Sequence, residues 1–309
     1  MHNIRWFRYL VSGLVFSILG TAVFAQDKGS VKPKPLPPLK KITASTPAKE
    51  LFGRKTTPAP LAPQPVGFYS KGCLAGGEMI PHDGPTWQVM RPSRNRNWGH
   101  PHLVAFLKKF AAAQPATSAW PGLLIGDMSQ TRGGPMLTGH ASHQIGLDAD
   151  IWLTPMPNRT LSRSERENTS AVNMVRADRL DIDPSVWTDN HVALIRAAAK
   201  ETQVQRIFVN PAIKKALCRE AGRDRAWLRK VRPTGGHNYH FHIRLRCPRG
   251  AAGCVAQAEV PAGDGCGEEL AWWFRDEVLN PKPVKNPKPR KQLTMSALPA
   301  FCQTVLDAE

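Results

Sequence analysis

Two histidine-rich segments, far apart in the sequence, constrain this 309-residue chain more than any other feature. The first is 139–150 and the second is 237–242. Imidazole and carboxylate groups are common protein ligands of zinc, and catalytic zinc sites use three such ligands and leave one position for water. The two segments together therefore predict a zinc site formed by His143, Asp150 and His242.

The first segment has the pattern of a half-buried strand. Residues 147–152 alternate apolar and acidic side chains, so Asp148 and Asp150 share one face of the strand. His143 precedes Gly146, where a turn can bring the imidazole back over the start of the strand. Asp148 is the rival ligand to Asp150, and its expected role is to accept a hydrogen bond from a ligating imidazole.

The second segment continues into another strand, 238–245, with the same period of two. His240, His242 and Arg244 share one face, and the residues between them are apolar. The two imidazoles are then about 7 Å apart along the strand. We expect His242 to hold the metal and His240 to reach a water molecule bound to it.

The spacing H-x6-D followed much later by H-x-H resembles that of zinc peptidases grouped with lysostaphin, the D-Ala-D-Ala carboxypeptidases and the hedgehog signalling domain. A longer resemblance, from about residue 69 to 274 and again at Cys302, is to penicillin-insensitive murein endopeptidases. Members of that family use a metal to hydrolyse the D-alanyl to meso-diaminopimelyl cross-links of peptidoglycan. The segments that carry the resemblance are 139–150, 206–213, 227–233, 245–248 and 263–267.

The resemblance implies a role for each histidine of the site. His140 would be a further metal ligand, His240 would be the general base or would stabilise developing charge, and His237 would line the same pocket. The zinc ligands that the resemblance implies are His140, His143, Asp150 and His242.

The family is also described with a second zinc ion at a dimer interface, which makes a homodimer possible here. Its ligands are an aspartate and a histidine three residues apart. The aligned residues are Asp178 and Asp181, so the histidine is absent and only Asp178 remains as a candidate ligand of that ion.

Six cysteines favour an oxidising compartment and a fully paired set of disulfides. The chain contains no Cys-x2-Cys pair of the kind that thiolate zinc sites use. Sequence alone leaves the pairing of the cysteines open. The family resemblance implies the pairs Cys73–Cys302, Cys218–Cys266 and Cys247–Cys254.

The termini have the composition of an exported protein. In residues 1–25, Arg5 and Arg8 precede an apolar run that ends at the small residue Ala25, which is typical of a cleaved signal peptide. We therefore expect a periplasmic protein without stable membrane insertion after signal cleavage.

Two Pro/Lys-rich segments, 31–41 and 280–291, favour extended, solvated conformations. They serve either as a tether to the anionic cell wall or as spacers.

The formal net charge of +18 favours an anionic partner. The basic residues form no recognition helix, so nucleic acid is not the expected partner. The family resemblance implies peptidoglycan as the partner. One α+β domain is predicted, with a central antiparallel sheet that carries the zinc site between helices and disulfide-braced loops. Strands are expected at 122–128 and 206–209, and helices at 102–113, 191–201, 212–218 and in part of 162–181. The predicted divisions are a signal peptide at 1–25, a linker at 26–66, the zinc peptidase domain at 67–278 and a Pro/Lys-rich segment at 279–309.

The zinc ligands and the family resemblance together imply a zinc-dependent metallo-endopeptidase that acts on peptidoglycan cross-links. No Ser-x-x-Lys motif is present, as a penicillin-sensitive acyl-enzyme would require. The alternatives are a D,D- or L,D-carboxypeptidase that acts on stem peptides, and a catalytically silent zinc-binding cell-wall protein. Arg132 is a candidate for holding a substrate carboxylate, and the competing interpretation is a solvated loop arginine.

Overall fold

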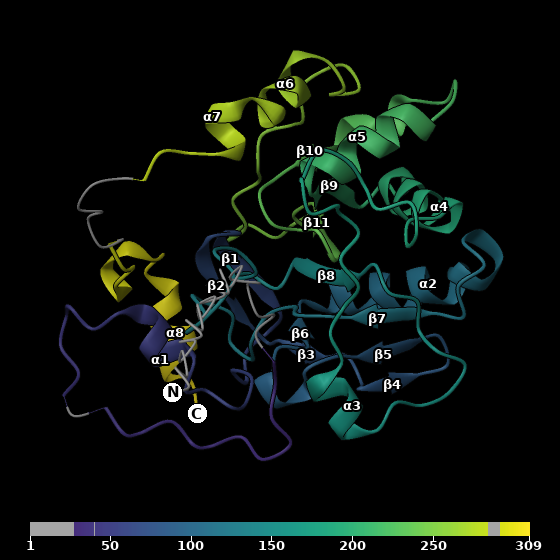
Figure 1. The fold of residues 1–309 in the computed structure, drawn as a ribbon. Coiled ribbons are helices and arrows are strands. Elements are labelled where there is room, and N and C mark those ends of the chain that lie inside the picture. Colours follow the sequence, from purple (N-terminus) through teal and green to yellow (C-terminus); the bar gives the residue numbers. More distant parts are fainter. Residues whose placement is uncertain (1–27, 40, 284–290) are drawn as a thin grey trace, which may run out of the picture.

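The computed structural model describes residues 28–39, 41–283 and 291–309 (Figure 1). The predicted signal peptide, 1–25, lies outside the described residues, as does most of the second Pro/Lys-rich segment. In the described part of the chain, every helix is too short or too polar to cross a membrane.

A seven-stranded mixed sheet forms the centre of the fold (Figure 1). Its four middle strands, in the order β9, β11, β8 and β7, are antiparallel to one another. β10 pairs parallel with β9, β5 pairs parallel with β7, and the edge strand β4 pairs antiparallel with β5. The seven strands are β4 (Asp83–Gly84), β5 (Trp87–Val89), β7 (Leu123–Ile125), β8 (Asp148–Trp152), β9 (Val204–Val209), β10 (Val231–Pro233) and β11 (His240–Leu245).

The prediction of an antiparallel sheet is therefore correct for the strands that carry the site and wrong for the parallel pairs β10–β9 and β5–β7. A helix lies between the strands of each parallel pair: α2 (Pro101–Thr117) between β5 and β7, and α5 (Pro211–Glu220) between β9 and β10. A helical crossover returns the chain to the same end of the sheet, which makes the flanking strands parallel.

The predicted helices are present, with shifted ends, because the sequence supplies their caps. The His100 side chain caps α2 and Asn210 caps α5, each followed by a proline in the first helical turn. The other helices are α1 (Ala48–Phe52), α3 (Arg163–Asn168), α4 (Asp189–Lys200), α6 (Glu268–Ala271), α7 (Asp276–Leu279) and α8 (Phe301–Asp307), with short 3₁₀ helices at Pro92–Arg94, Ala226–Lys230, Trp272–Phe274 and Met295–Ala297. Two small hairpin-like sheets, β1 (Gln64–Phe68) with β2 (Lys71–Ala75) and β3 (Glu78–Met79) with β6 (Trp98–Gly99), complete the fold.

The two faces of the central sheet differ sharply in polarity. Ala149 and Ile151 of β8, with Phe241 and Ile243 of β11, belong to one large buried cluster that includes apolar residues of α2 and α4. The alternating acidic and histidine residues of the same strands are on the opposite face, as the period of two predicts. Helices α2 and α4 therefore cover one face, and the site lies on the other.

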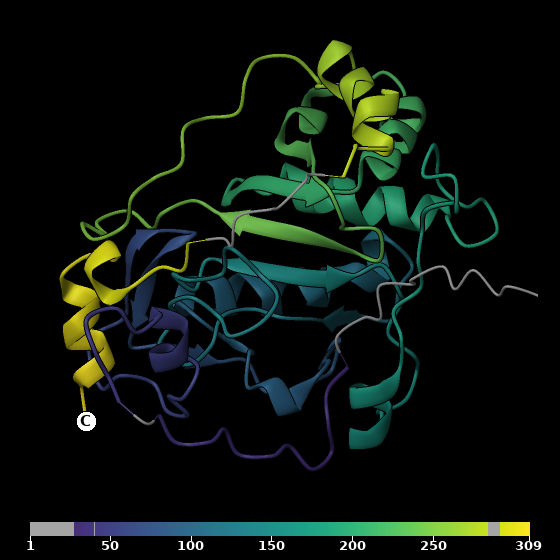
Figure 2. The ribbon, with the colours of Figure 1, turned by 60° about the vertical axis from the view of Figure 1, so that its left-hand side comes forward.

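A second cluster joins the two ends of the described chain. Phe52 of α1 and Val305 of α8 are fully buried with Cys73 of β2 and Cys302. Figure 2 shows α1 and α8 side by side at one end of the sheet. The division at residues 66 and 278 stays a prediction, but the predicted linker contains a buried helix, because its apolar residues pack against the C-terminal helix.

Arg132 belongs to this junction. Its side chain is buried, and Nη1 donates hydrogen bonds to the carbonyl oxygens of Val305, Leu306 and Ala308 at 2.6–3.0 Å. Carbonyl groups at the end of a helix have no partner within the helix, so a cation there is stabilising. Both interpretations of Arg132 from sequence are wrong: the guanidinium neither holds a substrate carboxylate nor is solvated.

The three disulfides are Cys73–Cys302, Cys218–Cys266 and Cys247–Cys254, the same pairs that the family resemblance implies. Cys247 follows β11, and Cys254 forms a parallel bridge with Gly67 of β1. The short disulfide therefore braces the loop that follows the strand carrying His240 and His242.

We expect the disulfides that close the shortest and the longest loops to differ in their effects on activity and stability. Cys247→Ser/Cys254→Ser opens a loop with a sequence separation of 7, and Cys73→Ser/Cys302→Ser opens one with a separation of 229. By the chain-entropy relation these loops correspond to about 2–3 and about 5 kcal/mol of stability. The first pair of substitutions should lower activity with a modest change in melting temperature, and the second should mainly lower the melting temperature. Thermal melts and turnover measured on the same preparations test this, and equal changes in melting temperature would contradict it.

Candidate metal and catalytic site

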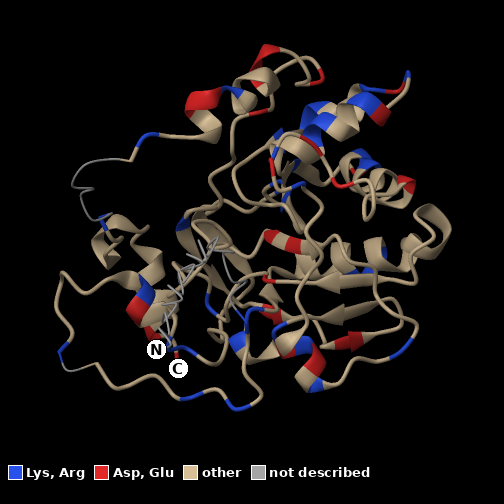
Figure 3. Cartoon of the chain, viewed as in Figure 1, with Lys and Arg blue, Asp and Glu red and all other residues tan. Residues whose placement is uncertain are grey.

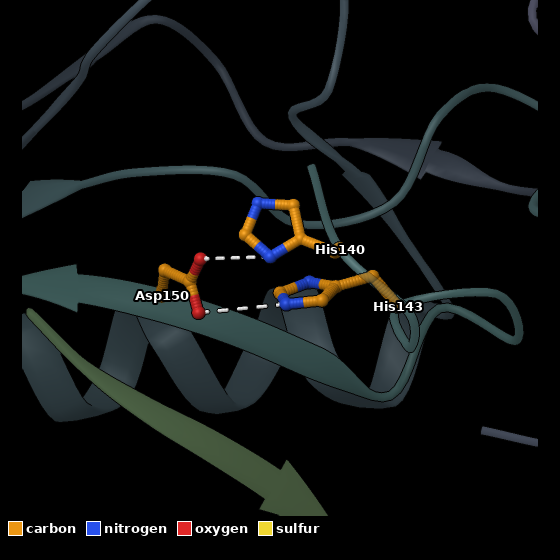
Figure 4. Close-up of side chains that lie close together, drawn as sticks. All are labelled: His140, His143 and Asp150. Atoms are coloured by element: carbon orange, nitrogen blue, oxygen red, sulfur yellow. Dashed lines mark ion pairs between the residues drawn. The ribbon is translucent and has the colours of Figure 1, made fainter. Parts of the chain in front are cut away.

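The Asp150 carboxylate on β8 is the centre of the site. Its Oδ1 lies 3.4 Å from His143 Nε2 and 3.3 Å from His242 Nδ1. Its Oδ2 lies 3.5 Å from His140 Nδ1 and 3.6 Å from His240 Nε2. Figure 4 shows His140 and His143 approaching the two oxygens from the same loop, and Figure 3 shows the acidic bands on β8. The structure thus brings the four predicted zinc ligands together, with the three histidine ligands and His240 around the Asp150 carboxylate.

A reversal of the chain before β8 brings His143 to this position. Gly146 has a φ of 70° and His143 has a φ of 67°, both in the left-handed region that tight turns use. The turn directs the His143 N–H to Asp148 Oδ2 at 3.0 Å. The predicted turn at Gly146 is therefore present, and it fixes the His143 ring over the strand.

Three atoms of the site have the spacing of metal ligands. His143 Nε2 lies 3.1 Å from His242 Nδ1, and both lie 3.3–3.4 Å from Asp150 Oδ1. Ligands about 2.0–2.1 Å from a tetrahedral ion are separated from one another by roughly 3.3 Å. Asp150 Oδ1 is buried and has no hydrogen-bond partner among the described residues. This donor set fits a zinc ion, which would give the buried carboxylate oxygen a positively charged partner.

His140 extends this set on one side. His140, His143 and Asp150 form a group whose ligand atoms all lie within 4.8 Å of one another. The His140 nitrogen faces the second oxygen of Asp150 rather than the first. The site therefore contains an inner set of three atoms, from His143, Asp150 and His242, and His140 as an outer donor.

Asp148, which is predicted to accept a hydrogen bond from a ligating imidazole, lies next to the His242 ring of the inner set. It is fully buried, and its oxygens accept hydrogen bonds from Arg244 Nε at 2.8 Å and Nη2 at 2.9 Å. Burial alone would raise the pKa of Asp148, but Arg244 and His242 hold it well below its usual range. His242 Nε2 lies 3.3 Å from Asp148 Oδ1, an arrangement that leaves Nδ1 directed at the inner set.

The charge state of His242 follows from the same contact. Burial opposes its protonation, but the Asp148 and Asp150 carboxylates together raise the pKa of His242 to about 9. A metal ion at the inner set would compete with a proton on Nδ1, because both use the same lone pair. Without a metal ion His242 is therefore protonated at neutral pH, with one nitrogen next to Asp148 and the other at the inner set.

His240 and His237 line the open side of the site. Burial lowers the pKa of His240 to about 3, so this ring is neutral at physiological pH and has a lone pair available. The centroid of the His237 ring lies 4.9 Å from that of His240, and His237 Nδ1 lies 3.0 Å from the carbonyl oxygen of Gly235. The two predicted catalytic histidines are thus neighbours at the edge of the inner set.

Residues 65–307 match the model of one protein family, penicillin-insensitive murein endopeptidase. The chain belongs to this family. It is 45% identical over 249 residues to the penicillin-insensitive murein endopeptidase of Haemophilus influenzae, covering 79% of this chain and 82% of the relative. The proteins of that name from Pectobacterium atrosepticum and Klebsiella pneumoniae are 42% and 43% identical, covering 86% and 85% of this chain and 90% and 92% of the relatives.

A cleft of about 400 Å³ opens beside the inner set. Several polar and aromatic residues that line it were not singled out from the sequence, because segments remote from the histidines supply most of them. Three arginines, Arg91, Arg94 and Arg96, line one wall of the cleft. Trp152, at the end of β8, lies next to them, and its ring centroid is 5.1 Å from the Arg91 guanidinium. The lining residues missed by sequence reasoning are Arg91, Arg94, Arg96, Asp127, Trp152, Asn238 and Tyr239.

Asp127 is the missed residue with the most direct contact to a predicted ligand. Its Oδ2 lies 3.0 Å from His140 Nε2 and accepts hydrogen bonds from Arg96 at 2.9 Å and Arg94 at 3.1 Å. Burial would raise the pKa of Asp127, but the hydrogen bond with His140 and the two arginines hold it well below its usual range. The signal in the sequence is an aspartate at the end of the predicted strand 122–128, which alone does not identify a partner.

The residues aligned with the family's second metal site contact basic side chains. Asp178 is exposed, forms an ion pair with Arg176 and accepts a hydrogen bond from the Leu180 N–H at 2.9 Å. Asp181 pairs with Arg219 at 3.0 Å and with Lys215 at 3.5 Å. A metal ion at Asp178 stays a prediction, and these arginine and lysine contacts would compete with it.

Proposed function

We propose that this protein is a zinc-dependent murein endopeptidase that hydrolyses D-alanyl to meso-diaminopimelyl cross-links in peptidoglycan. The observation that carries the proposal is the inner set, in which His143 Nε2, His242 Nδ1 and Asp150 Oδ1 lie within 3.1–3.4 Å of one another beside a cleft. Family membership supports the same reaction, because the relatives are named murein endopeptidases.

The residues of the site divide the chemistry among them. Zinc held by the inner set would lower the pKa of a bound water toward about 7 and polarise the scissile carbonyl. Asp148 and Arg244 keep His242 in the orientation that presents Nδ1. We propose that His240, whose Nε2 lies 3.6 Å from Asp150 Oδ2, accepts the proton of the attacking water and passes it to the leaving amine. His237 is placed to stabilise the charge that develops on the carbonyl oxygen.

The basic wall of the cleft suits an anionic substrate. Arg91, Arg94 and Arg96 line the side of the cleft next to Asp127, and peptidoglycan stems carry free carboxylates. Positive potential in a cleft raises the local concentration of such groups. We propose peptidoglycan as the partner and, from the disulfides and the murein-acting relatives, the periplasm as the location.

The two alternatives have weaker support. A carboxypeptidase must hold the terminal carboxylate of its substrate, and the residue considered for this purpose, Arg132, is buried against the C-terminal helix. A catalytically silent zinc protein has no need of an acid or base next to the metal, yet His240 lies 3.6 Å from Asp150. The first observation removes one candidate residue for binding a terminal carboxylate, and the second favours an enzyme over a silent metal-binding protein.

Digestion of purified cross-linked muropeptide dimers tests the proposal. We expect conversion of dimers to monomers, loss of this activity in a strong chelator, its recovery when zinc is restored, and no inhibition by penicillin. Mass spectrometry identifies the new termini. Release of a terminal D-alanine from dimers that remain cross-linked would instead support the carboxypeptidase.

A further inference from the structure

Asp127 is buried between the site and two arginines. Its side chain is 3% exposed, and one oxygen, Oδ2, meets His140 Nε2, Arg96 Nη1 and Arg94 Nη1 at 3.0, 2.9 and 3.1 Å. Arg96 and Arg94 can only donate, so Asp127 is their acceptor. The same oxygen can accept a hydrogen bond from His140 only if His140 carries its proton on Nε2.

This contact sets the orientation of the His140 ring. A neutral imidazole has one N–H and one lone pair, and the hydrogen bond at one nitrogen decides which nitrogen carries the lone pair. With its proton directed to Asp127, His140 presents the Nδ1 lone pair toward Asp150 Oδ2, 3.5 Å away. That is the form of the ring that can bind a metal ion.

The main chain holds Asp127 in register with Asp150. The Asp150 N–H donates to the Asp127 carbonyl oxygen at 2.9 Å, and the Gly126 N–H donates to the Asp150 carbonyl oxygen at 2.8 Å. Arg96 also joins Asp127 to the loop that precedes His140, because its Nη2 donates to the carbonyl oxygen and the hydroxyl of Thr138, each at 3.0 Å. The carboxylate, the strand and the histidine loop therefore form one connected unit.

His140 needs this support more than the inner ligands do. Its side chain is 23% exposed, whereas that of His143 is fully buried and that of His242 is 4% exposed. His140 also follows Gly139, which has a φ of 84°. The His140 ring packs against that of His143, with centroids 4.3 Å apart, and its hydrogen bond to Asp127 fixes which nitrogen faces Asp150.

We propose that Asp127 is a positioning residue that holds His140 as an outer ligand of the metal, with Arg96 securing both Asp127 and the His140 loop. The proposal rests on the proposed function only in that zinc occupies the inner set. It assigns Asp127 an effect on zinc affinity that acts through His140.

Zinc affinity, measured by competition with a chromophoric chelator in the absence of substrate, tests this inference. Loss of an outer partner of a metal ligand typically weakens binding about 10- to 100-fold, and we expect a loss of this size for Asp127→Ala. His140→Ala should lose about as much. The double variant Asp127→Ala/His140→Ala should bind zinc as His140→Ala does, because coupled residues are not additive. Asp127→Asn, which keeps an acceptor oxygen, should lose less than Asp127→Ala.

Asp264→Ala is the matched control, since Asp264 also pairs with an arginine, Arg225, at 2.7 Å but lies outside the cleft. Its zinc affinity should equal that of the unaltered chain. If Asp127→Ala does not fold, as judged by its melting curve, Asp127→Asn and Arg96→Gln provide the comparison with His140→Ala. Zinc affinity within twofold of the unaltered chain in the folded Asp127 variants, or losses that multiply in the double variant, would overturn the inference while leaving the proposed function intact. Failure of the unaltered chain to bind zinc would overturn both.

Discussion

His242→Ala is expected to abolish zinc retention and muropeptide hydrolysis together. The substitution removes Nδ1, which lies 3.1 Å from His143 Nε2 and 3.3 Å from Asp150 Oδ1, and so leaves two of the three inner donors. It also removes Nε2, which lies 3.3 Å from Asp148 Oδ1. Metal content after dialysis and turnover on muropeptide dimers, measured on one preparation, test the expectation.

His240→Ala is the matched variant, because His240 is two residues away on the same face of β11. It should retain zinc and slow turnover by roughly 10²–10⁴, the usual contribution of a positioned acid or base. The structure supports this division, since His240 Nε2 faces Asp150 Oδ2 while His242 Nδ1 faces Oδ1 in the inner set. Loss of zinc from His240→Ala with retention in His242→Ala would show that the two roles are reversed.

Arg244→Ala should lower the free energy of unfolding by about 3–5 kcal/mol, the usual result of leaving a buried charge without its partner. Asp148 is fully buried, and Arg244 donates two hydrogen bonds to it from Nε and Nη2. The guanidinium also lies 4.1 Å from the centroid of the Tyr69 ring and donates to Gln257 Oε1 at 2.9 Å. Urea unfolding at neutral pH measures the change.

Arg246→Ala is the control for this prediction. Arg246 also forms an ion pair, with Glu259, but its side chain is 41% exposed and that of its partner is 61% exposed. Exposed pairs contribute under about 1 kcal/mol, because water already solvates both charges. Equal destabilisation by Arg244→Ala and Arg246→Ala would mean that the Asp148–Arg244 pair does not carry the stability assigned to it.

Strand alternation made the contents of the site predictable. A period of two places Asp148 with Asp150, and His240 with His242 and Arg244, on one face of each strand, and the structure confirms this. What alternation leaves open is the register between the strands. The structure pairs His242 with Asp150 and Arg244 with Asp148, and a shift by one residue would have turned one set to the apolar face.

The sequence by itself determined which local elements form and which side chains each one presents, because caps, turns and alternation depend on neighbours along the chain. Only the tertiary structure decided which of those side chains meet. Asp127 became a partner of His140, and Arg132 a cap for α8, through contacts between segments that no local pattern relates. The mixed order of the sheet has the same origin, since the direction of its outer strands depends on how α2 and α5 return the chain to the sheet. These long-range contacts form because packing the elements together buries apolar surface, and because buried charges must then be paired.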